Sequence, residues 1–205
     1  MRSQLGRVAR TAPPAGLLLG FVDFLWITFV PFPLGDLGNS SAVWAVAAFA
    51  FAYRLRSTWL WAAVGAAMAL VIAVPSYYLT AALVQGDDLA VLWAAPSVLW
   101  MGFGVLAGVV FGTAGTWARG QGWRQVLGVA LPGAVLFAEA VMQARRIGNP
   151  NYGDDPLAHA AIRAVLGALV IVLAGRTNRQ RLLALAAAAP LTLAGVGAFL
   201  VGGFR

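Results

Sequence analysis

The sequence predicts an all-α fold, a polytopic membrane helical bundle of about seven transmembrane helices that forms a single domain over residues 1–205. The first observation behind this prediction is that 61% of the residues are hydrophobic and only 10% are charged. Such a composition, divided into long apolar runs, is typical of membrane proteins. The second observation is that no polar stretch is long enough to form a linker or a soluble domain.

The first three apolar segments cover residues 14–33, 40–54 and 58–84. The first follows a basic N-terminus and resembles a secretory signal, but it lacks a small-x-small cleavage site and is expected to remain as a helix. The second is short for a span of about 20 residues. If it re-enters the membrane instead of crossing it, the count falls to six.

The last four apolar segments cover residues 89–115, 125–144, 157–175 and 181–203. Gly104, Gly108 and Gly112 recur every four residues in the first of these segments, and this spacing allows helices to approach closely. The same spacing relates Gly16 and Gly20 in the first segment of the chain. The last segment is rich in alanine, and we expect a kink at its proline. The sequence shows no convincing internal repeat.

Loop charges predict the orientation of the bundle. Ten loop arginines lie on one side of the predicted membrane without any acid: Arg2, Arg7, Arg10, Arg54, Arg56, Arg119, Arg124, Arg176, Arg179 and Arg181. Five aspartates lie on the other side: Asp36, Asp87, Asp88, Asp154 and Asp155. The positive-inside rule then places the N-terminus in the cytoplasm and the C-terminus outside. All 14 basic residues are arginine, which indicates a GC-rich genome and the plasma membrane of a bacterium.

The composition excludes several kinds of chemistry. The chain has no cysteine, so disulfides and thiol chemistry are excluded. Its only histidine is His159, which excludes metal sites of the Cys/His kind, and we expect neither a metal nor a cofactor. The net charge of +7 comes from arginines between apolar runs, so we expect no nucleic-acid partner.

Two carboxylates lie within predicted spans and are the candidate catalytic residues. Asp23 lies in GLLLGFVDFLWITFV and Glu139 in LPGAVLFAEAVMQA. A charge at mid-bilayer costs about 3 kcal/mol on insertion scales, so such a residue usually faces the protein interior and marks a functional site. We expect both carboxylates to face one cavity in the outer half of the bundle. The alternative for each is a buried polar link that only holds helices together; for Glu139 the partner would be Arg163 or Arg146.

Candidate substrate-binding residues gather at the same predicted depth. They are Trp26, Trp44, Tyr77, Tyr78, Trp93, Ser97, Trp100, Gln143, Arg146, His159 and Arg163. Helical spacing places Glu139, Gln143 and Arg146 on one stripe, and it places Trp93, Ser97 and Trp100 on another. Polar stripes on several helices at one depth predict a cavity that opens toward the outer leaflet. Arg145 and Arg146 either pair with Asp154 and Asp155 across their loop, or one of them turns inward toward Glu139 or a substrate.

Three classes of function remain open. The first is a membrane-bound cyclase of the isomerase or lyase type that protonates an alkene or epoxide in the prenyl chain of a lipophilic substrate. Aromatic faces would stabilise the resulting carbocation, each by up to about 2 kcal/mol. Glu139 is the expected initiating acid because Gln143 and Arg146 lie within its reach, whereas Asp23 has no donor at helical spacing. The second class is a small proton-coupled transporter or channel that uses both acids, and the third is a membrane scaffold.

A resemblance supports the first class. The pattern of GLLLGFVDF, then LGNSSAVWAVAAFAFA, then a late intramembrane glutamate in GAVLFAEA resembles a family of small, mostly uncharacterised actinobacterial membrane proteins. As a helical bundle with two intramembrane acids, the chain also resembles the bacterial integral-membrane terpene cyclases of meroterpenoid pathways. That resemblance implies paired acids that start and steer cyclisation, carried here by Asp23 and Glu139. The implied partners are a prenylated small molecule and membrane lipid, and the sequence leaves the oligomeric state open.

Overall fold

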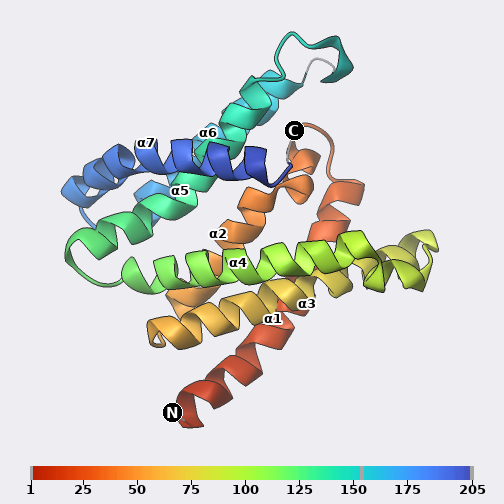
Figure 1. Cartoon of the computed structure of the whole chain (residues 1–205), viewed down its shortest axis with the longest axis horizontal. Coiled ribbons are helices and arrows are strands. Elements are labelled where there is room, and N and C mark those ends of the chain that lie inside the picture. The colour runs from red at the N-terminus through yellow and green to blue at the C-terminus, as the bar shows by residue number, and fades with distance from the viewer. Residues whose placement is uncertain (1, 153–154, 204–205) are drawn as a thin grey trace. The chain divides into compact units, whose positions relative to one another are not determined.

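The computed structural model describes residues 2–152 and 155–203, and this part of the chain forms seven α-helices and three short 3-10 helices (Figure 1). The α-helices are α1 (Arg2–Phe29), α2 (Ser41–Leu55), α3 (Trp59–Gln85), α4 (Ala95–Trp117), α5 (Gly122–Ala144), α6 (Pro156–Ala174) and α7 (Asn178–Val201). The 3-10 helices are η1 (Leu34–Asn39), η2 (Leu89–Trp93) and η3 (Pro150–Tyr152). Six of the described α-helices are long and apolar enough to cross a membrane, and α2 is the shorter one. The predicted all-α, multi-pass membrane fold is confirmed.

Prolines explain why the observed bounds of two helices differ from those of the predicted segments. The first predicted segment runs to residue 33, but α1 ends at Phe29, shortly before Pro31 and Pro33. Proline lacks a backbone N–H and disfavours helical geometry in the residue before it. The fourth predicted segment begins at residue 89, but α4 begins at Ala95 with Pro96 in its first turn, where proline is tolerated.

The side chain of Trp93 therefore does not lie on an α4 stripe with Ser97 and Trp100, and that prediction is wrong. Trp93 belongs to η2, where Asp88 Oδ1 accepts a hydrogen bond from the backbone N–H of Ala90 at 2.9 Å. The Trp93 side chain is 74% exposed. Ser97 is fully buried and donates a hydrogen bond to the carbonyl oxygen of Val91 at 2.6 Å, so it ties η2 to the start of α4.

The chain divides into two compact units, which are described one at a time. Unit 1 contains Met1–Val30 and Trp44–Thr116, and unit 2 contains Pro31–Val43 and Trp117–Arg205. The segment between α1 and α2 thus belongs to unit 2, although the helices on either side of it belong to unit 1. The assignment of one domain to the whole chain stays a prediction.

Close helix packing through glycine holds unit 1 together. A methyl group on Gly20 of α1 would overlap the carbonyl oxygen of Ala73 in α3, and one on Gly108 of α4 would overlap the backbone of Ala67. The predicted role of these glycine spacings is confirmed. Ser76 Oγ also donates a hydrogen bond to the carbonyl oxygen of Leu17 at 2.7 Å, which joins α3 to α1.

The first and third helices of unit 1 run in the same direction. Arg7 Nη1 donates to the carbonyl oxygen of Leu55 at 3.2 Å, and Gln4 Oε1 accepts a hydrogen bond from Thr58 Oγ1 at 3.0 Å. The start of α1 therefore lies beside the end of α2 and the start of α3. Near the opposite end of α1, Phe24 lies beside Tyr77 with ring centroids 5.5 Å apart. Because α1 and α3 are parallel, α2 carries the chain back to the end where α1 begins, which favours the seven-segment count.

Unit 2 is built on α5. Gln180 Nε2 of α7 donates to Gln125 Oε1 at 3.0 Å, and Thr192 Oγ1 donates to the carbonyl oxygen of Ala134 at 3.4 Å, so α7 runs parallel to α5. A methyl group on Gly133 would lie 2.8 Å from the carbonyl oxygen of Gly167 in α6, so α5 and α6 also pack closely. Arg163 of α6 is hydrogen-bonded to Glu139 of α5, and this contact shows that the two helices run antiparallel.

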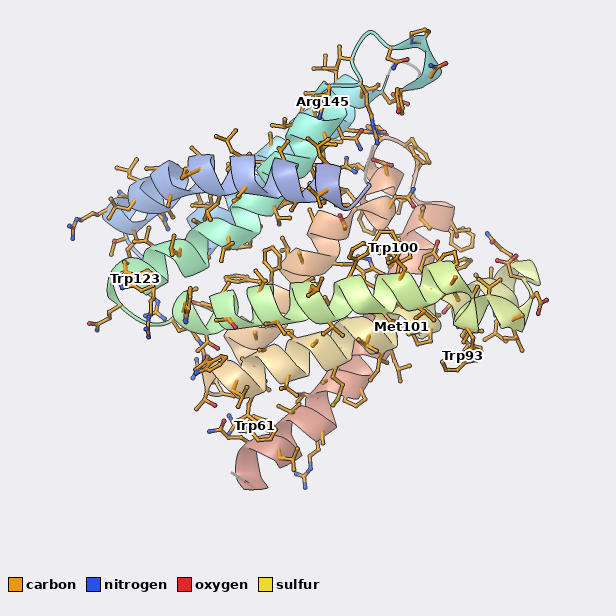
Figure 2. All side chains as sticks on the ribbon, viewed as in Figure 1. Trp61, Trp93, Trp100, Met101, Trp123 and Arg145 are labelled. Atoms are coloured by element: carbon orange, nitrogen blue, oxygen red, sulfur yellow. The ribbon has the colours of Figure 1, made fainter. Side chains whose placement is uncertain are left out.

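Figure 2 shows Trp123 at the start of α5 and Arg145 just past its end. The ring of Trp123 lies 5.9 Å from that of Trp117, and the guanidinium of Arg124 lies over both rings. Such a grouping is typical of the aromatic residues that membrane proteins place at the membrane–water interface. Arg145 marks the other end of α5, which is predicted to be external.

Candidate functional site

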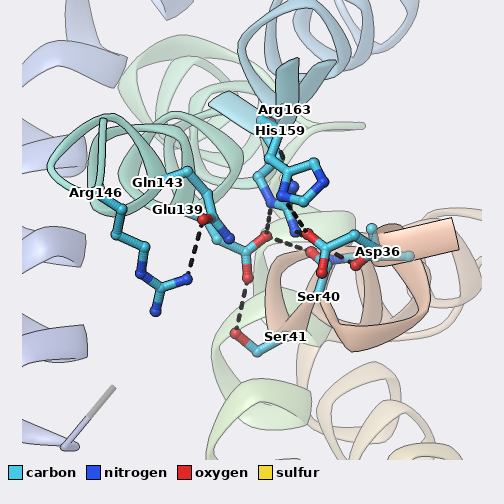
Figure 3. Close-up of polar contacts among 9 residues, drawn as sticks. Asp36, Ser40, Ser41, Glu139, Gln143, Arg146, His159 and Arg163 are labelled. Carbon is cyan, nitrogen blue, oxygen red and sulfur yellow. Dashed lines mark hydrogen bonds and ion pairs between the residues drawn. The ribbon is translucent and has the colours of Figure 1, made fainter. Parts of the chain in front are cut away.

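A buried arginine organises a cluster of polar side chains in unit 2 (Figure 3). The Arg163 side chain is only 2% exposed, and it donates hydrogen bonds from all three of its nitrogen atoms. Its Nε donates to Glu139 Oε2 at 2.8 Å and its Nη2 to Asp36 Oδ2 at 2.7 Å. Its Nη1 donates to the carbonyl oxygen of His159 at 3.2 Å. One guanidinium thus binds two carboxylates that come from different segments of the chain.

Helix geometry brings these groups together. Glu139 lies five residues before Ala144, the last residue of α5 (144 − 139 = 5), and Arg163 lies seven residues after Pro156, the first residue of α6 (163 − 156 = 7). At about 1.5 Å of rise per residue, both lie within about 11 Å of the ends that the connecting loop joins. The Arg163–Glu139 contact therefore requires antiparallel helices. His159 precedes Arg163 by four residues and shares its face of α6.

Glu139 is held by further donors at the start of α2. Ser40 Oγ donates to Glu139 Oε2, and Ser41 Oγ donates to Oε1 at 3.3 Å. Ser40 Oγ also accepts a hydrogen bond from the backbone N–H of Val43 at 3.1 Å, so it caps the first turn of α2. Both serines lie in unit 2, as does Glu139. The Glu139 carboxylate therefore has three partners, which is the environment that a buried anion requires.

Asp36 is the functional candidate that sequence reasoning missed. The loop charges place it among the external aspartates, but it lies in η1 and its carboxylate accepts a hydrogen bond from Arg163. His159 Nδ1 lies 3.3 Å from the same carboxylate oxygen of Asp36. His159 Nε2 is buried and has no hydrogen-bond partner among the described residues. A signal was present in the sequence: an arginine inside a predicted span requires an acid at the same depth.

The predicted stripe on α5 is present only in part. Arg146 Nη1 donates to Gln143 Oε1 at 3.0 Å, but it is Arg163 that reaches Glu139. The guanidinium of Arg146 lies 4.8 Å from the ring centroid of Tyr152. Asp154 lies outside the described residues, so the predicted ion pair across the loop stays a prediction. Arg163, His159, Gln143 and Arg146 are thus near one another, as the sequence suggested, but with different pairings.

Asp23 lies in unit 1 among aromatic side chains. Its residue is 7% exposed, and the side chain of Trp44 in α2 lies within hydrogen-bonding range of its carboxylate. Tyr77 of α3 lies close enough to interact with it electrostatically, and the rings of Tyr77 and Tyr78 meet edge to face at 5.4 Å. Asp23 thus has a nearby donor on another helix, although none lies at helical spacing on its own.

The other aromatic candidates are more exposed. Trp26 and Trp100 both lie in unit 1 and are partly exposed, and Trp100 stacks edge to face with Phe103 at 5.8 Å. Because Asp23 belongs to unit 1 and Glu139 to unit 2, one cavity shared by the two acids stays a prediction. The substrate-binding roles of all these residues stay predictions as well.

The two acids have different chemical capacities. Glu139 is bound by the positively charged guanidinium of Arg163 and by two serine hydroxyl groups. To act as an acid, Glu139 would first have to leave Arg163, Ser40 and Ser41. Asp23 has Trp44 and Tyr77 as its described partners, and neither carries a positive charge. This geometry favours Asp23 over Glu139 as a proton donor or proton carrier.

One family of proteins matches nearly the whole chain. The model of a family described as "Family of unknown function (DUF6518)" matches residues 2–203. No curated protein and no solved structure matches the chain. The family description names no activity, so the resemblance to terpene cyclases stays a prediction. This polytopic membrane protein belongs to the DUF6518 family.

Proposed function

We propose that the protein is a membrane-embedded enzyme that protonates the prenyl chain of a lipophilic substrate and so starts its cyclisation. Asp23 is the proposed general acid. The observation that carries this proposal is a buried carboxyl group in a predicted span that interacts with two aromatic side chains, Trp44 and Tyr77. Intramembrane acids are commonly functional, and aromatic faces stabilise cations in a dry site.

The proposed reaction is an isomerisation that consumes no co-reactant. The Asp23 carboxyl group donates its proton to the epoxide oxygen, the carbon–oxygen bond breaks, and a tertiary carbocation forms. A neighbouring double bond attacks this cation and closes the ring, and the cyclised cation then loses a proton that restores the Asp23 carboxyl group. An epoxide suits a carboxylic acid better than a plain alkene does, because its oxygen is the more basic group. The apolar surroundings exclude water that would otherwise quench the cation.

The test is turnover by the purified protein in nanodiscs with farnesylated and epoxyfarnesylated aromatic substrates, followed by mass spectrometry and chromatography of isomeric products. Asp23→Asn removes the proton and keeps the size of the side chain, so its rate should fall by about 100-fold or more. Asp87→Asn is a matched control, since Asp87 lies in an exposed loop beyond α3. Near-normal turnover by a folded Asp23→Asn variant would refute the proposed role of Asp23.

A second candidate, a proton-coupled carrier, is favoured by a different observation. Each unit contains a pair of parallel helices with one helix between them in the sequence. The pair is α1 with α3 in unit 1 and α5 with α7 in unit 2. The first helix of each pair carries an acid near its end. Asp23 lies six residues before Phe29, the last residue of α1, and Glu139 lies five residues before Ala144, the last residue of α5. Repeated helix arrangements are common in secondary transporters. Proton uptake into liposomes that depends on Asp23, without product formation, would favour the carrier.

A further inference from the structure

We propose that the end of unit 2 where α5 and α7 begin is a surface that binds the headgroups of anionic phospholipids through Arg124, Arg176 and Arg179. This proposal concerns unit 2 alone and is independent of the function proposed for Asp23. It rests on the convergence of these arginines, on the charges around them and on two tryptophan rings that hold one of them.

The first observation is that two connections of the chain bring arginines to the same end of unit 2. The hydrogen bond from Gln180 Nε2 to Gln125 Oε1 places the first turn of α7 beside the first turn of α5. Arg124 directly precedes Gln125, and Arg179 directly precedes Gln180. Arg176 lies just before α7, and its backbone N–H donates to Gln180 Oε1 at 3.0 Å. The three arginines therefore lie at one end of the unit, although residues 124 and 176 are far apart in the sequence.

The second observation is that these guanidinium groups are available to an external ligand. Arg124, Arg176 and Arg179 are exposed, and their side chains form no hydrogen bond or ion pair with the described residues. Arg181 differs, because its Nε donates to the carbonyl oxygens of Val172 at 3.0 Å and Gly175 at 3.1 Å and so closes the end of α6. An arginine guanidinium offers a planar set of donors that matches the oxygen atoms of a phosphate group.

The third observation is that no acid of unit 2 offsets this positive charge. Residues 117–138 and 156–203 contain neither aspartate nor glutamate. Glu139 lies 17 residues after Gly122, which is about 26 Å along the axis of α5, and it is already paired with Arg163. Charges in solution are largely screened beyond about 8 Å at physiological salt. The positive end of unit 2 thus calls for an anion from outside the unit.

The fourth observation is the aromatic pair beside Arg124, which favours a lipid over a soluble anion. The guanidinium carbon lies 5.9 Å from the ring centroid of Trp117 and 5.5 Å from that of Trp123, within the range of cation–π contacts. The two rings therefore hold Arg124 in place before a ligand binds, which lowers the entropy cost of binding. Trp123 is 63% exposed at the start of α5 (Figure 2). Membrane proteins place such indoles at the level of the lipid headgroups, where the ring meets apolar lipid and the neighbouring arginine meets phosphate.

The first test compares an anionic with a zwitterionic lipid. Native mass spectrometry of the purified protein in an uncharged detergent measures its affinity for added phosphatidylglycerol and for phosphatidylcholine. Arg124→Gln and Arg179→Gln should each lower the affinity for phosphatidylglycerol about fivefold, which is the usual contribution of one arginine near an anionic surface, and should leave the affinity for phosphatidylcholine unchanged. Arg145→Gln is the matched control, because it removes an exposed arginine beyond the opposite end of α5. No loss in the two variants, or an equal loss in the control, would overturn the proposal.

The second test separates a lipid from a soluble anion. Phosphatidylglycerol should raise the thermal unfolding temperature of the unaltered protein more than that of the double variant Arg124→Gln with Arg179→Gln. Inorganic phosphate at the same concentration should produce no such difference, and an equal effect of phosphate would show that the surface binds soluble anions. Trp123→Leu keeps an apolar side chain but removes the ring from Arg124, so it should lower the affinity for phosphatidylglycerol about twofold to fivefold. Unchanged affinity in this variant would show that the indole takes no part in binding.

Discussion

Arg163 is the residue on which the unit 2 site depends. A buried charge is tolerated only when it is paired and fully hydrogen-bonded, and Arg163 meets this condition through Glu139, Asp36 and the carbonyl of His159. A lysine could not replace it, because an ammonium group lacks the planar, three-sided arrangement of donors. The guanidinium therefore selects both the partners and their directions.

Removing this guanidinium should be costly. Arg163→Gln leaves Asp36 and Glu139 without a counter-charge, and breaking a buried pair in this way costs about 3–5 kcal/mol. Thermal unfolding in detergent should show a large loss of stability for this variant. The triple variant Arg163→Gln with Asp36→Asn and Glu139→Gln carries no unpaired charge, so it should regain much of the loss. If the single and triple variants are equally unstable, the charges are not what Arg163 balances.

Residues of the site differ in how far the sequence predicts them. Glu139, His159 and Arg163 follow from their polarity within apolar helices, and His159 and Arg163 also follow from their spacing of four residues on α6. Asp36 could not be found in this way, because helical spacing says nothing about a loop that folds back onto two helices. The pairing of Glu139 with Arg163 instead of Arg146 depends on how α5 and α6 pack, which is a tertiary property.

At the scale of the element, glycines set the distances between helices. Gly108 of α4 lies against the backbone of Ala67, whereas Gly102 in the same helix has nothing within 4 Å of where a methyl group would stand. The sequence predicted the first role from the spacing of Gly104, Gly108 and Gly112. The sequence does not predict which helix packs against these glycines, since any helix with a flat face could do so.

Gly108→Ala should therefore destabilise unit 1, while Gly102→Ala should not. The added methyl group at residue 108 meets backbone atoms, which cannot move aside like a flexible side chain, and overpacking of this kind costs about 1–3 kcal/mol or more. At residue 102 the alanine has open space and a better helix propensity. Unfolding of both variants in detergent, measured side by side, checks the difference. Similar stability of the two variants would contradict the close contact of α3 and α4.

The sequence predicts the middle of a helix better than its ends, because single residues decide where a helix begins. The apolar run from residue 89 to residue 115 reads as one helix by hydropathy, yet it contains both η2 and α4. Pro96 lies in the first turn of α4, a position that proline favours, and it marks the start of that helix. Ser97 then bonds to Val91, which fixes the bend between η2 and α4. Hydropathy detects the apolar run, whereas the break is encoded by one proline and one hydroxyl group.

At the scale of the whole molecule, the two units use the same arrangement without evident sequence similarity. Helices α1 and α3 are parallel in unit 1, and α5 and α7 are parallel in unit 2. The sequence shows no convincing internal repeat, and each pair is joined by its own residues. In unit 1 Gln4 bonds to Thr58 and Phe24 lies beside Tyr77. In unit 2 Gln180 bonds to Gln125 and Thr192 bonds to the carbonyl oxygen of Ala134.

The parallel pair in unit 1 leads to a topology prediction. Since Gln4 and Thr58 are hydrogen-bonded, the starts of α1 and α3 lie on the same side of the membrane, and α2 must cross it despite its 15 residues. At about 1.5 Å per residue α2 spans about 22 Å, less than the roughly 30 Å of a bilayer core. The flanking residues must supply the remaining length. Seven crossings then place the N-terminus inside and the C-terminus outside, in agreement with the loop charges.

The absence of cysteine makes this prediction easy to check, because each introduced thiol is unique. Single variants Thr58→Cys, Asp87→Cys, Gln121→Cys and Asn149→Cys place a thiol in successive loops, and Gly203→Cys places one near the C-terminus. A membrane-impermeant maleimide applied to intact cells should label residues 87, 149 and 203, and should spare residues 58 and 121 until the cells are opened. If α2 does not cross, every loop after it changes sides: residues 58 and 121 become labelled, and residues 87, 149 and 203 become protected. With the N-terminus in the cytoplasm, each outcome inverts the other at all five positions, so the labelling series then decides between seven crossings and six.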